Sequence, residues 1–390
     1  MDTADGVQAA TVVRVAIDAS RTTVGQVTGT EHYATRLIAA LIKHNTNHPF
    51  TIYYRDSPPI NVFSASKYVT SRIIPFRRAW THVRFALELW RDKPNVTFVP
   101  AHTLPFLFPG RGVVTVHDLG FKYFPQAHPT GQRLYLDWTT RYSARRASIV
   151  LADSQATARD LTRFYGTEAE KIRVVYPGVD RPSPPPPLQE GQESKSSWSE
   201  ADVEAVRRKY KLPERYFLFI GTLQPRKNIA RIVQAYAQWW SGHQAEGIGL
   251  VLAGGKGWLY DEAWVTGVPN VYLPGYIDEA DKGALYAGAV ALVFPSLYEG
   301  FGFPVIEAMH CGTPVITSST SSLPELAGDA AILVNPEEVY TIADALEDVA
   351  SNEGLRQSLR EKGYAQAAKF TWEKAAEQAM AALAAAVTGK

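Results

Sequence analysis

The chain has 390 residues, enough for two domains of ordinary size, each with its own hydrophobic core. Its 40 lysines and arginines almost balance its 39 aspartates and glutamates, so the charge does not favour a nucleic acid partner. The single cysteine, Cys311, excludes a disulfide within the chain, and we expect a cytoplasmic protein. No run of about eighteen apolar residues occurs, which argues against a spanning helix and leaves peripheral attachment at the inner face of a membrane open.

Buried strands alternate with helices in the first part of the chain. Residues 1–10 are polar and are expected to be disordered, and the first buried run is Val12–Ile17. Apolar residues then recur with helical spacing over residues 31–43. Further strands are predicted at residues 50–54, 71–74, 96–99, 113–116 and 148–152. This alternation indicates an α/β domain built on a parallel, doubly wound sheet.

A glycine turn precedes the helix over residues 31–43. Thr28 and Glu31 have capping-box spacing, which would begin the helix at Gly29 and leave the N–H groups of Gly29 and Thr30 pointing outward. Unpaired N–H groups at a helix start attract anions, so these two residues are candidate phosphate contacts. A simple capped helix explains the same pattern about as well.

A basic and aromatic helix is predicted over residues 78–91. One stripe of this helix contains Trp80, Val83, Leu87 and Trp90, and arginines occupy its other faces. Such a helix can lie on a lipid surface. We favour the alternative in which the stripe faces the core and the arginines are solvated.

The strand over residues 113–116 ends in His117 and Asp118. Because the carboxyl ends of parallel strands border the ligand crevice of an open sheet, His117 is a candidate substrate contact. A lone histidine is more often structural, and only its place at the strand end favours the ligand role. Asp118 either orients His117 or serves a second substrate, and the pattern leaves both open.

A change in composition marks the boundary between two domains. Residues 181–198 include Pro184–Pro187 followed by polar residues that cannot bury a core, and a helix over residues 199–210 comes next. We therefore predict a first domain over residues 1–180, a linker and connecting helix over 181–210, and a second domain over 211–370. A last helix is predicted within residues 371–390.

The second domain begins with a strand and a glycine-led loop that carries Arg226 and Lys227. A guanidinium forks across two oxygens and an ammonium supplies a point charge, so this pair suits a diphosphate. A later strand over residues 249–255 contains Gly254 at its end, where a missing side chain lets a ligand approach the backbone.

Two carboxylates flank a glycine turn further along the chain. Glu299 lies on a loop after a short buried strand, and Glu307 lies in the opening turns of the helix that follows. Gly300 and Gly302 allow unusual backbone angles and close approach of a ligand. Carboxylates placed here can accept hydrogen bonds from the hydroxyls of a ribose or a hexose.

The spacing of Glu299 and Glu307 with Gly-Phe-Gly between them resembles the signature of the retaining glycosyltransferases of family 4. The resemblance extends from about Val12 to the last helix. It implies the GT-B fold, an α/β class in which two Rossmann-like doubly wound domains face across a cleft and the last helix crosses back to the first domain. It also implies transfer of a hexose from a nucleotide-diphosphate sugar to a saccharide or lipid-linked acceptor, with retention of configuration.

The resemblance assigns expected roles to individual residues. Arg226 and Lys227 would hold the diphosphate, and His117 would reach the donor sugar near its reacting carbon. Glu307 would bind the ribose and Glu299 the hexose, while main chain near residues 276–277 would contact the base. The predicted catalytic residues are His117, Glu299, Arg226 and Lys227, and the predicted donor-binding residues are Gly29, Thr30, Gly254, Tyr276, Ile277, Gly300, Phe301, Gly302, Val305 and Glu307.

The donor is expected to bind without a metal ion or any other cofactor, because no Asp-x-Asp triplet occurs in the chain. The runs at residues 117–121 and 221–228 most resemble mannosyltransferase-like members, which favours GDP-mannose and leaves a UDP-sugar as the alternative. The rival functions are an epimerase or phosphorylase of the same fold and a non-catalytic protein that binds sugar nucleotides.

Overall fold

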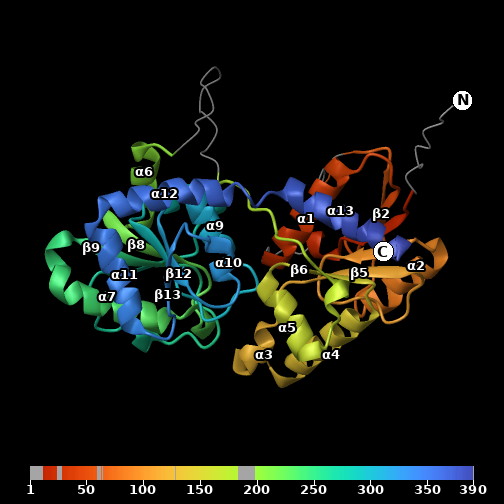
Figure 1. Cartoon of the computed structure of the whole chain (residues 1–390), viewed down its shortest axis with the longest axis horizontal. Helices are drawn as coiled ribbons and strands as arrows, with labels where there is room; N and C mark the ends of the chain where they lie inside the picture. Colours follow the sequence, from red (N-terminus) through yellow and green to blue (C-terminus); the bar gives the residue numbers. More distant parts are fainter. Residues whose placement is uncertain are drawn as a thin grey trace, which may run out of the picture.

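The computed structural model describes residues 12–23, 29–58, 63, 65–127, 129–182 and 198–389. Two lobes, each built on a parallel sheet, lie side by side (Figure 1). The α/β class with two doubly wound sheets is therefore confirmed. The disorder expected of residues 1–10, the cap at Thr28 and the proline run Pro184–Pro187 fall outside the described residues.

The first lobe contains a seven-stranded sheet with the order β3-β2-β1-β4-β5-β6-β7, in which every described pair is parallel. The order reverses between β1 and β4, and such a switch point opens a crevice at the carboxyl ends of the strands. The strands are β1 Val15–Asp18, β2 Phe50–Tyr54, β3 Val69–Ile73, β4 Val96–Val99, β5 Arg111–Val116, β6 Ile149–Ala152 and β7 Ile172–Val174.

Helices cover both faces of this sheet. Its central strands are therefore buried along their whole length. Ser154 caps α5 by accepting the N–H of Thr157, as expected for a serine before a helix. The helices are η1 Ser20–Thr23, α1 Gly29–His44, η2 Thr81–Phe85, α2 Ala86–Asp92, α3 Gly120–Tyr123, η3 Pro125–Ala127, α4 Thr130–Arg146, α5 Gln155–Tyr165 and η4 Ala169–Lys171.

The helix predicted over residues 78–91 differs from the expectation. Its first turn, η2, is π-helical, and the N–H of Phe85 bonds to the carbonyl of Trp80 at 2.9 Å. This wider turn changes the register, so that Trp80, Phe85 and Leu89 are buried. The expectation of a core-facing stripe is wrong for its other members, which are exposed: Val83, Leu87 and Trp90.

The second lobe contains a six-stranded parallel sheet with the order β10-β9-β8-β11-β12-β13. Its strands are β8 Arg215–Ile220, β9 Ile248–Ala253, β10 Val271–Gly275, β11 Ala291–Phe294, β12 Val315–Ser318 and β13 Ile332–Val334. Its helices are α6 Glu200–Tyr210, η5 Pro225–Lys227, α7 Ile229–His243, η6 Gln244–Glu246, η7 Glu262–Trp264, η8 Glu279–Asp281, α8 Lys282–Ala287, α9 Phe303–His310, α10 Leu323–Ala327, α11 Val339–Ser351 and α12 Glu353–Ala367.

Two stretches of chain pass between the lobes and lie side by side. The N–H of Val179 donates to the carbonyl of Phe370 at 3.0 Å, and a Cβ at Gly178 would lie 2.2 Å from the nitrogen of Trp372. The last helix, α13 Trp372–Thr388, then packs on α1 and shares the core of the first lobe (Figure 1). Among the described helices, none has both the length and the apolar character needed to cross a bilayer.

Candidate active site

Two cavities lie where the carboxyl ends of the two sheets face each other. The first, called the α9 cavity, has a volume of about 580 Å³ and is lined by the start of α9, the ends of β8 and β9, and Gly29 of α1. The second, called the α4 cavity, has a volume of about 630 Å³ and is lined by α4, the loop after β4 and loops of the second lobe. The first helix α1 therefore begins between the two cavities, with Thr30 lining the α4 cavity.

Glycines form the floor of the α9 cavity. Gly254 follows β9 with a φ of +134°, and a Cβ there would lie 2.0 Å from the carbonyl oxygen of Gly221. Its N–H donates to the carbonyl of Gly275 at 2.7 Å. Because Gly254 has no side chain, the ends of β8 and β9 can lie this close together and leave backbone exposed to the cavity.

Glu307 lies on α9 and lines the α9 cavity. The hydroxyl of Tyr286 donates to its Oε2 atom at 2.7 Å, which fixes one oxygen of the carboxylate. The glycine before α9, Gly302, has a φ of +130°, and Pro304 stands in the first turn of the helix. Lys282 lines the same cavity, and its attraction to Glu307 helps to raise the pKa of Lys282 against the opposing effect of burial.

Glu299 lies between two cations of the loop after β8. Its Oε2 atom accepts a hydrogen bond from Arg226 at 3.0 Å, and its Oε1 atom accepts one from Lys227 at 2.6 Å. Burial by itself raises the pKa of Glu299, but the two cations lower it overall. The pKa of Lys227 is lowered, because burial outweighs its attraction to Glu299. We call these three side chains the charge cluster, and it carries one net positive charge.

The loop that holds the charge cluster is anchored by Asn228. Its φ is +65°, a conformation that asparagine tolerates better than most residues. The Nδ2 atom of Asn228 donates to the carbonyls of Pro295 at 3.0 Å and Pro336 at 2.6 Å. These bonds tie the cationic loop to the segment that leads into Glu299, so the three charged groups are placed before any ligand binds.

His117 is held by the protein at both ring nitrogens. Its Nδ1 atom lies 2.7 Å from Asp153 Oδ2, and its Nε2 atom lies 3.3 Å from the carbonyl oxygen of Pro100. When Asp153 is ionised both partners are acceptors, and both bonds then use the doubly protonated ring. Burial alone lowers the pKa of His117, but the Asp153 carboxylate raises it overall. Both ring nitrogens of His117 are therefore engaged by the protein.

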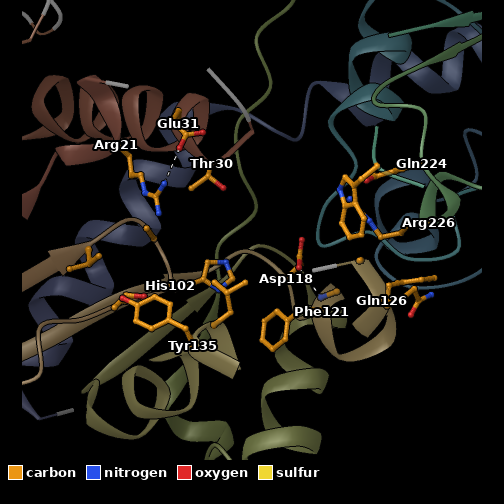
Figure 2. A pocket seen from close by; sticks show the side chains of 18 of the residues that line it. Arg21, Thr30, Glu31, His102, Asp118, Phe121, Gln126, Tyr135, Gln224 and Arg226 are labelled. Atoms are coloured by element: carbon orange, nitrogen blue, oxygen red, sulfur yellow. Dashed lines mark hydrogen bonds and ion pairs between the residues drawn. The ribbon is translucent and has the colours of Figure 1, made fainter. Parts of the chain in front are cut away.

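His102 is a second histidine at the carboxyl edge of the sheet, and the sequence reasoning missed it. Its Nε2 atom accepts the N–H of His117 at 3.3 Å, so its own proton lies on Nδ1. Burial lowers the pKa of His102 to about 4, and nearby His117 adds to the effect. The buried Nδ1 atom has no hydrogen-bond partner among the described residues, and the ring lines the α4 cavity (Figure 2). Its position three residues after β4 is the signal that would have found it.

The walls of the α4 cavity come from both lobes. Figure 2 shows Gln224 and Arg226 of the second lobe across from His102, Asp118 and Tyr135 of the first. On the wall formed by η1 and α1, Arg21 and Glu31 form an ion pair at 3.3 Å. Donors and acceptors therefore surround this cavity, as a ligand rich in hydroxyls requires.

The predicted site residues divide into three groups. Five line the α9 cavity: Gly29, Gly254, Tyr276, Ile277 and Glu307. Thr30 and Arg226 line the α4 cavity. The other seven line neither cavity. Two of these seven, Phe301 and Val305, are buried in the core of the second lobe. The other five are His117, Lys227, Glu299, Gly300 and Gly302.

One group of side chains in the described part of the chain has the spacing of metal ligands. It consists of His243, Glu246 and Glu347, which lie on α7, η6 and α11. None of the three lines either cavity. This group therefore lies outside both cavities.

Comparison with known proteins gives family matches in both lobes. Residues 27–181 match the model described as Glycosyltransferase Family 4, and residues 202–366 match Glycosyl transferases group 1. The chain is 32% identical over 310 residues to the O-antigen chain mannosyltransferase B of Escherichia coli. The aligned region covers 78% of this chain and 76% of the E. coli protein.

Solved structures share the arrangement of the two lobes. Sucrose-phosphate synthase from Thermosynechococcus elongatus gives a TM-score of 0.70 at 21% identity, covering 95% of this chain and 98% of that one. The Anabaena protein HepE, solved in complex with UDP-glucose, gives a TM-score of 0.69 at 15% identity. That match covers 95% of this chain and 100% of the HepE chain. These similarities support the GT-B fold, and the matches in both lobes together with the identity to the E. coli enzyme show that the chain belongs to the glycosyltransferases of family 4.

Proposed function

We propose that this glycosyltransferase moves mannose from GDP-mannose to a hydroxyl of a saccharide or lipid-linked acceptor, with retention of configuration and without a metal ion. The observation that carries the proposal is the charge cluster of Arg226, Lys227 and Glu299, which is prearranged by its own hydrogen bonds and whose Arg226 lines the α4 cavity. The mannosyltransferase named among the relatives, at 32% identity, supports the choice of sugar.

The α9 cavity suits the nucleotide half of the donor. Its volume of about 580 Å³ lies within the usual range of small-molecule sites. Glu307 keeps one carboxylate oxygen that Tyr286 does not occupy, and this oxygen can accept bonds from a ribose diol. Tyr276 is 74% exposed at the cavity and offers an aromatic surface to a base, and Ile277 beside it is buried.

The charge cluster suits the diphosphate at the seam of the lobes. Negative charge grows on the leaving phosphate as the bond to the sugar breaks, and fixed cations stabilise it without reorganising. Arg226 and Lys227 would supply this stabilisation. Both oxygens of Glu299 are already bonded to these cations, so Glu299 is poorly placed to attack carbon, and we assign it to hydroxyl binding and to positioning.

The configuration at the anomeric carbon is retained if the leaving group and the acceptor lie on the same face of the sugar. The bond from the anomeric carbon to the phosphate oxygen breaks, and a bond from that carbon to the acceptor oxygen forms. The acceptor proton passes to the departing phosphate, so no protein base is required. Proton NMR of a fresh reaction product would reveal the anomer, and an inverted product would contradict this course.

Metal independence is the second part of the proposal. Arg226 and Lys227 supply the positive charge that a divalent ion would otherwise bring to a diphosphate. Turnover should therefore be unchanged by a chelator. Loss of turnover in the presence of a chelator, followed by recovery on addition of a divalent ion, would contradict metal independence.

Calorimetric titration of GDP, UDP and ADP, followed by a donor-hydrolysis assay with the matching sugar nucleotides, tests the donor. Selective GDP binding with slow release of mannose is the expected result. A preference for UDP would keep the fold and site but replace the donor by a UDP-sugar. Binding without turnover on any acceptor or water would favour a non-catalytic sugar-nucleotide binder.

A further inference from the structure

Three neighbouring strands of the first sheet lead into polar side chains at the wall of the α4 cavity. Asp18 ends β1, His102 follows β4 and Asp118 follows β5. Adjacent strands lie about 4.8 Å apart, so the ends of β1 and β5 are separated by roughly 10 Å. This spacing leaves room for one sugar ring between two hydrogen bonds of about 2.7 Å each. Between the two carboxylates, His102 adds no charge near neutral pH, because burial lowers its pKa to about 4.

Asp118 does not have the task of orienting the ring of His117. That ring is bonded to Asp153 at 2.7 Å and to the carbonyl of Pro100 at 3.3 Å, so other groups occupy both of its nitrogens. The Oδ1 atom of Asp118 accepts the N–H of Gly120 at 2.8 Å, which fixes the carboxylate at the cavity wall (Figure 2). Of the two roles that the sequence leaves open for Asp118, the structure therefore favours contact with a second substrate.

Asp18 is a buried carboxylate, only 5% exposed, in the wall of the same cavity. Its Oδ1 atom accepts the N–H of Ser20 at 2.9 Å. Burial raises the pKa of Asp18 more than its hydrogen bonds and the nearby arginines lower it. Within the described part of the chain, neither Asp18 nor Asp118 forms an ion pair. Because a buried carboxylate is costly without partners, hydroxyl groups of a ligand would stabilise it.

The charged groups of the cavity wall do not suit a phosphate ester. The described residues that line the cavity supply two guanidiniums, from Arg21 and Arg226, against three carboxylates, from Asp18, Glu31 and Asp118. Each guanidinium already bonds a carboxylate, Arg21 at 3.3 Å and Arg226 at 3.0 Å. A phosphorylated ligand would therefore meet two carboxylates that no described cation neutralises.

We propose that the α4 cavity binds one uncharged sugar ring of the acceptor, whose hydroxyls donate to Asp18 and Asp118, and that it rejects phosphorylated sugars. Ionised carboxylates accept hydrogen bonds from hydroxyls, whereas they repel a phosphate. Arg226 of the charge cluster lies in the same wall, so the bound ring is beside the phosphate that leaves the donor. This assignment rests on the proposed function, since only a transferase has an acceptor.

Aromatic side chains complete a sugar site in this cavity. Phe121 of α3, Tyr135 of α4 and Trp258, which follows β9 in the second lobe, all line it. Tyr135 and Trp258 are 49% and 43% exposed, so their rings offer apolar surface to the C–H groups of a sugar. A few polar groups within apolar walls are typical of a small-molecule site.

Transfer assays with two matched sets of acceptors test the preference for an uncharged ring. The probes are the methyl glycosides of mannose, glucose, galactose and N-acetylglucosamine, and the 6-phosphates of the same four. The donor is the sugar nucleotide that the calorimetric titration selects. At least one neutral glycoside should accept, with kcat/KM about tenfold or more above that of its 6-phosphate, because like charges in contact are costly. Equal or better use of a 6-phosphate would overturn the proposal.

Donor hydrolysis separates this proposal from the proposed function. Hydrolysis of the sugar nucleotide without transfer to any neutral glycoside would overturn the assignment of the cavity while the donor site stands. Absence of both nucleotide binding and hydrolysis would remove the proposed function, and this assignment with it.

Asp18→Asn and Asp118→Asn locate the contacts. Asparagine keeps an oxygen for the N–H of Ser20 or Gly120, so each turn stays closed and only the charge is removed. The KM for the best neutral glycoside should rise about tenfold, the loss expected for a hydrogen bond to a charged acceptor. The preference over the 6-phosphate should fall. Affinity for GDP should stay the same, since neither aspartate lines the α9 cavity.

Asp56→Asn is the matched control. Asp56 is an exposed carboxylate just beyond the end of β2, and it lines neither cavity. Its substitution should leave both KM and the preference for uncharged acceptors unchanged. Wild-type KM and preference in both cavity variants, or equal changes in the control, would refute the roles of Asp18 and Asp118.

Discussion

Gly300 of the second lobe lies directly against the backbone of His117 in the first lobe. A Cβ at Gly300 would stand 2.2 Å from the carbonyl oxygen of His117 and 2.6 Å from Asp118 Cβ. The hydroxyl of Thr157 lies 3.1 Å from that carbonyl oxygen and 3.4 Å from the carbonyl oxygen of Gly300. The loop that carries Glu299 and the strand end that carries His117 therefore touch, and the absence of a side chain at Gly300 permits it.

Gly300→Ala should lower turnover about tenfold or more, because the added methyl group must push the two lobes apart and a displacement near 1 Å is costly for positioned groups. Nucleotide affinity should change little, since Gly300 does not line the α9 cavity. Steady-state kinetics and calorimetry check the two parts. Gly242→Ala is the control, because nothing lies within 4 Å of a Cβ at that helical position. Equal effects of both substitutions would disprove the contact.

Glu307→Ala should weaken nucleotide binding about tenfold, the loss expected for hydrogen bonds to a charged acceptor. Tyr286→Phe should have a smaller effect, because it removes only the hydroxyl that orients the carboxylate at 2.7 Å. Calorimetric titration of the nucleotide measures both. Glu377→Ala removes an exposed carboxylate on α13 and serves as the control. Wild-type affinity in Glu307→Ala would remove this residue from the donor site.

Lys227→Met should lower the free energy of unfolding by about 3 kcal/mol, because it leaves the buried Glu299 with one cation instead of two. Adding Glu299→Gln should restore part of that stability without restoring turnover. Chemical denaturation and a turnover assay separate the two readouts. At the exposed pair of Lys256 and Glu262, Lys256→Met should leave unfolding nearly unchanged. Turnover of the double variant at the wild-type rate would show that the cations are not part of the reaction.

Glu325→Ala should loosen the contact between the lobes. The Glu325 carboxylate accepts the N–H groups of Gln155 at 2.9 Å and Ala156 at 3.0 Å, at the start of α5 in the other lobe, and the Tyr176 hydroxyl at 2.8 Å. Without this cap we expect about 1 kcal/mol of lost stability and a larger radius of gyration in solution scattering. Added nucleotide should reduce the radius. A radius equal to that of the wild type would mean that Glu325 does not hold the lobes together.

Patterns in the sequence were sufficient for the two sheets and for much of the α9 cavity. Strands β2 and β4 coincide with their predicted ranges, because buried strands in parallel sheets are short runs of β-branched and aromatic residues. The helix predicted over residues 199–210 is also present as α6, and Ser199 caps it with Asp202 completing the capping box. Local signals of this kind need no knowledge of what the chain packs against.

Contacts between the lobes were not predictable in the same way. The pairing of Gly300 with His117, and the cap that Glu325 gives to α5, join residues more than a hundred positions apart, and no local spacing marks them. The π-helical turn at η2 was missed for a related reason. A regular 3.6-residue period places Trp80 and Trp90 on one face, whereas one extra residue in the turn separates them.

Asp153→Asn should move the titration of His117 to lower pH. Asp153 helps to hold the pKa of His117 above its ordinary value of about 6.5, and without this carboxylate the lowering effect of burial is opposed only by Asp118 and the carbonyl of Pro100. A raised pKa in the folded state means that the charged ring stabilises the fold below pH about 6.5 and that this contribution is lost as the pH rises through the raised pKa. Turnover that depends on the imidazolium should fall over the same range.

The alkaline limb of the pH–rate profile should therefore shift to lower pH in Asp153→Asn, and NMR titration of the His117 ring should show the same shift. His102 provides an internal check in the NMR titration. Burial lowers its pKa to about 4, so its ring should stay neutral over the pH range in which His117 titrates. Asp261→Asn, which alters an exposed carboxylate on the second lobe, is the control for general effects of charge. If the profile of Asp153→Asn overlays that of the wild type, the charge on His117 has no part in the reaction and its role is confined to holding the backbone against Gly300.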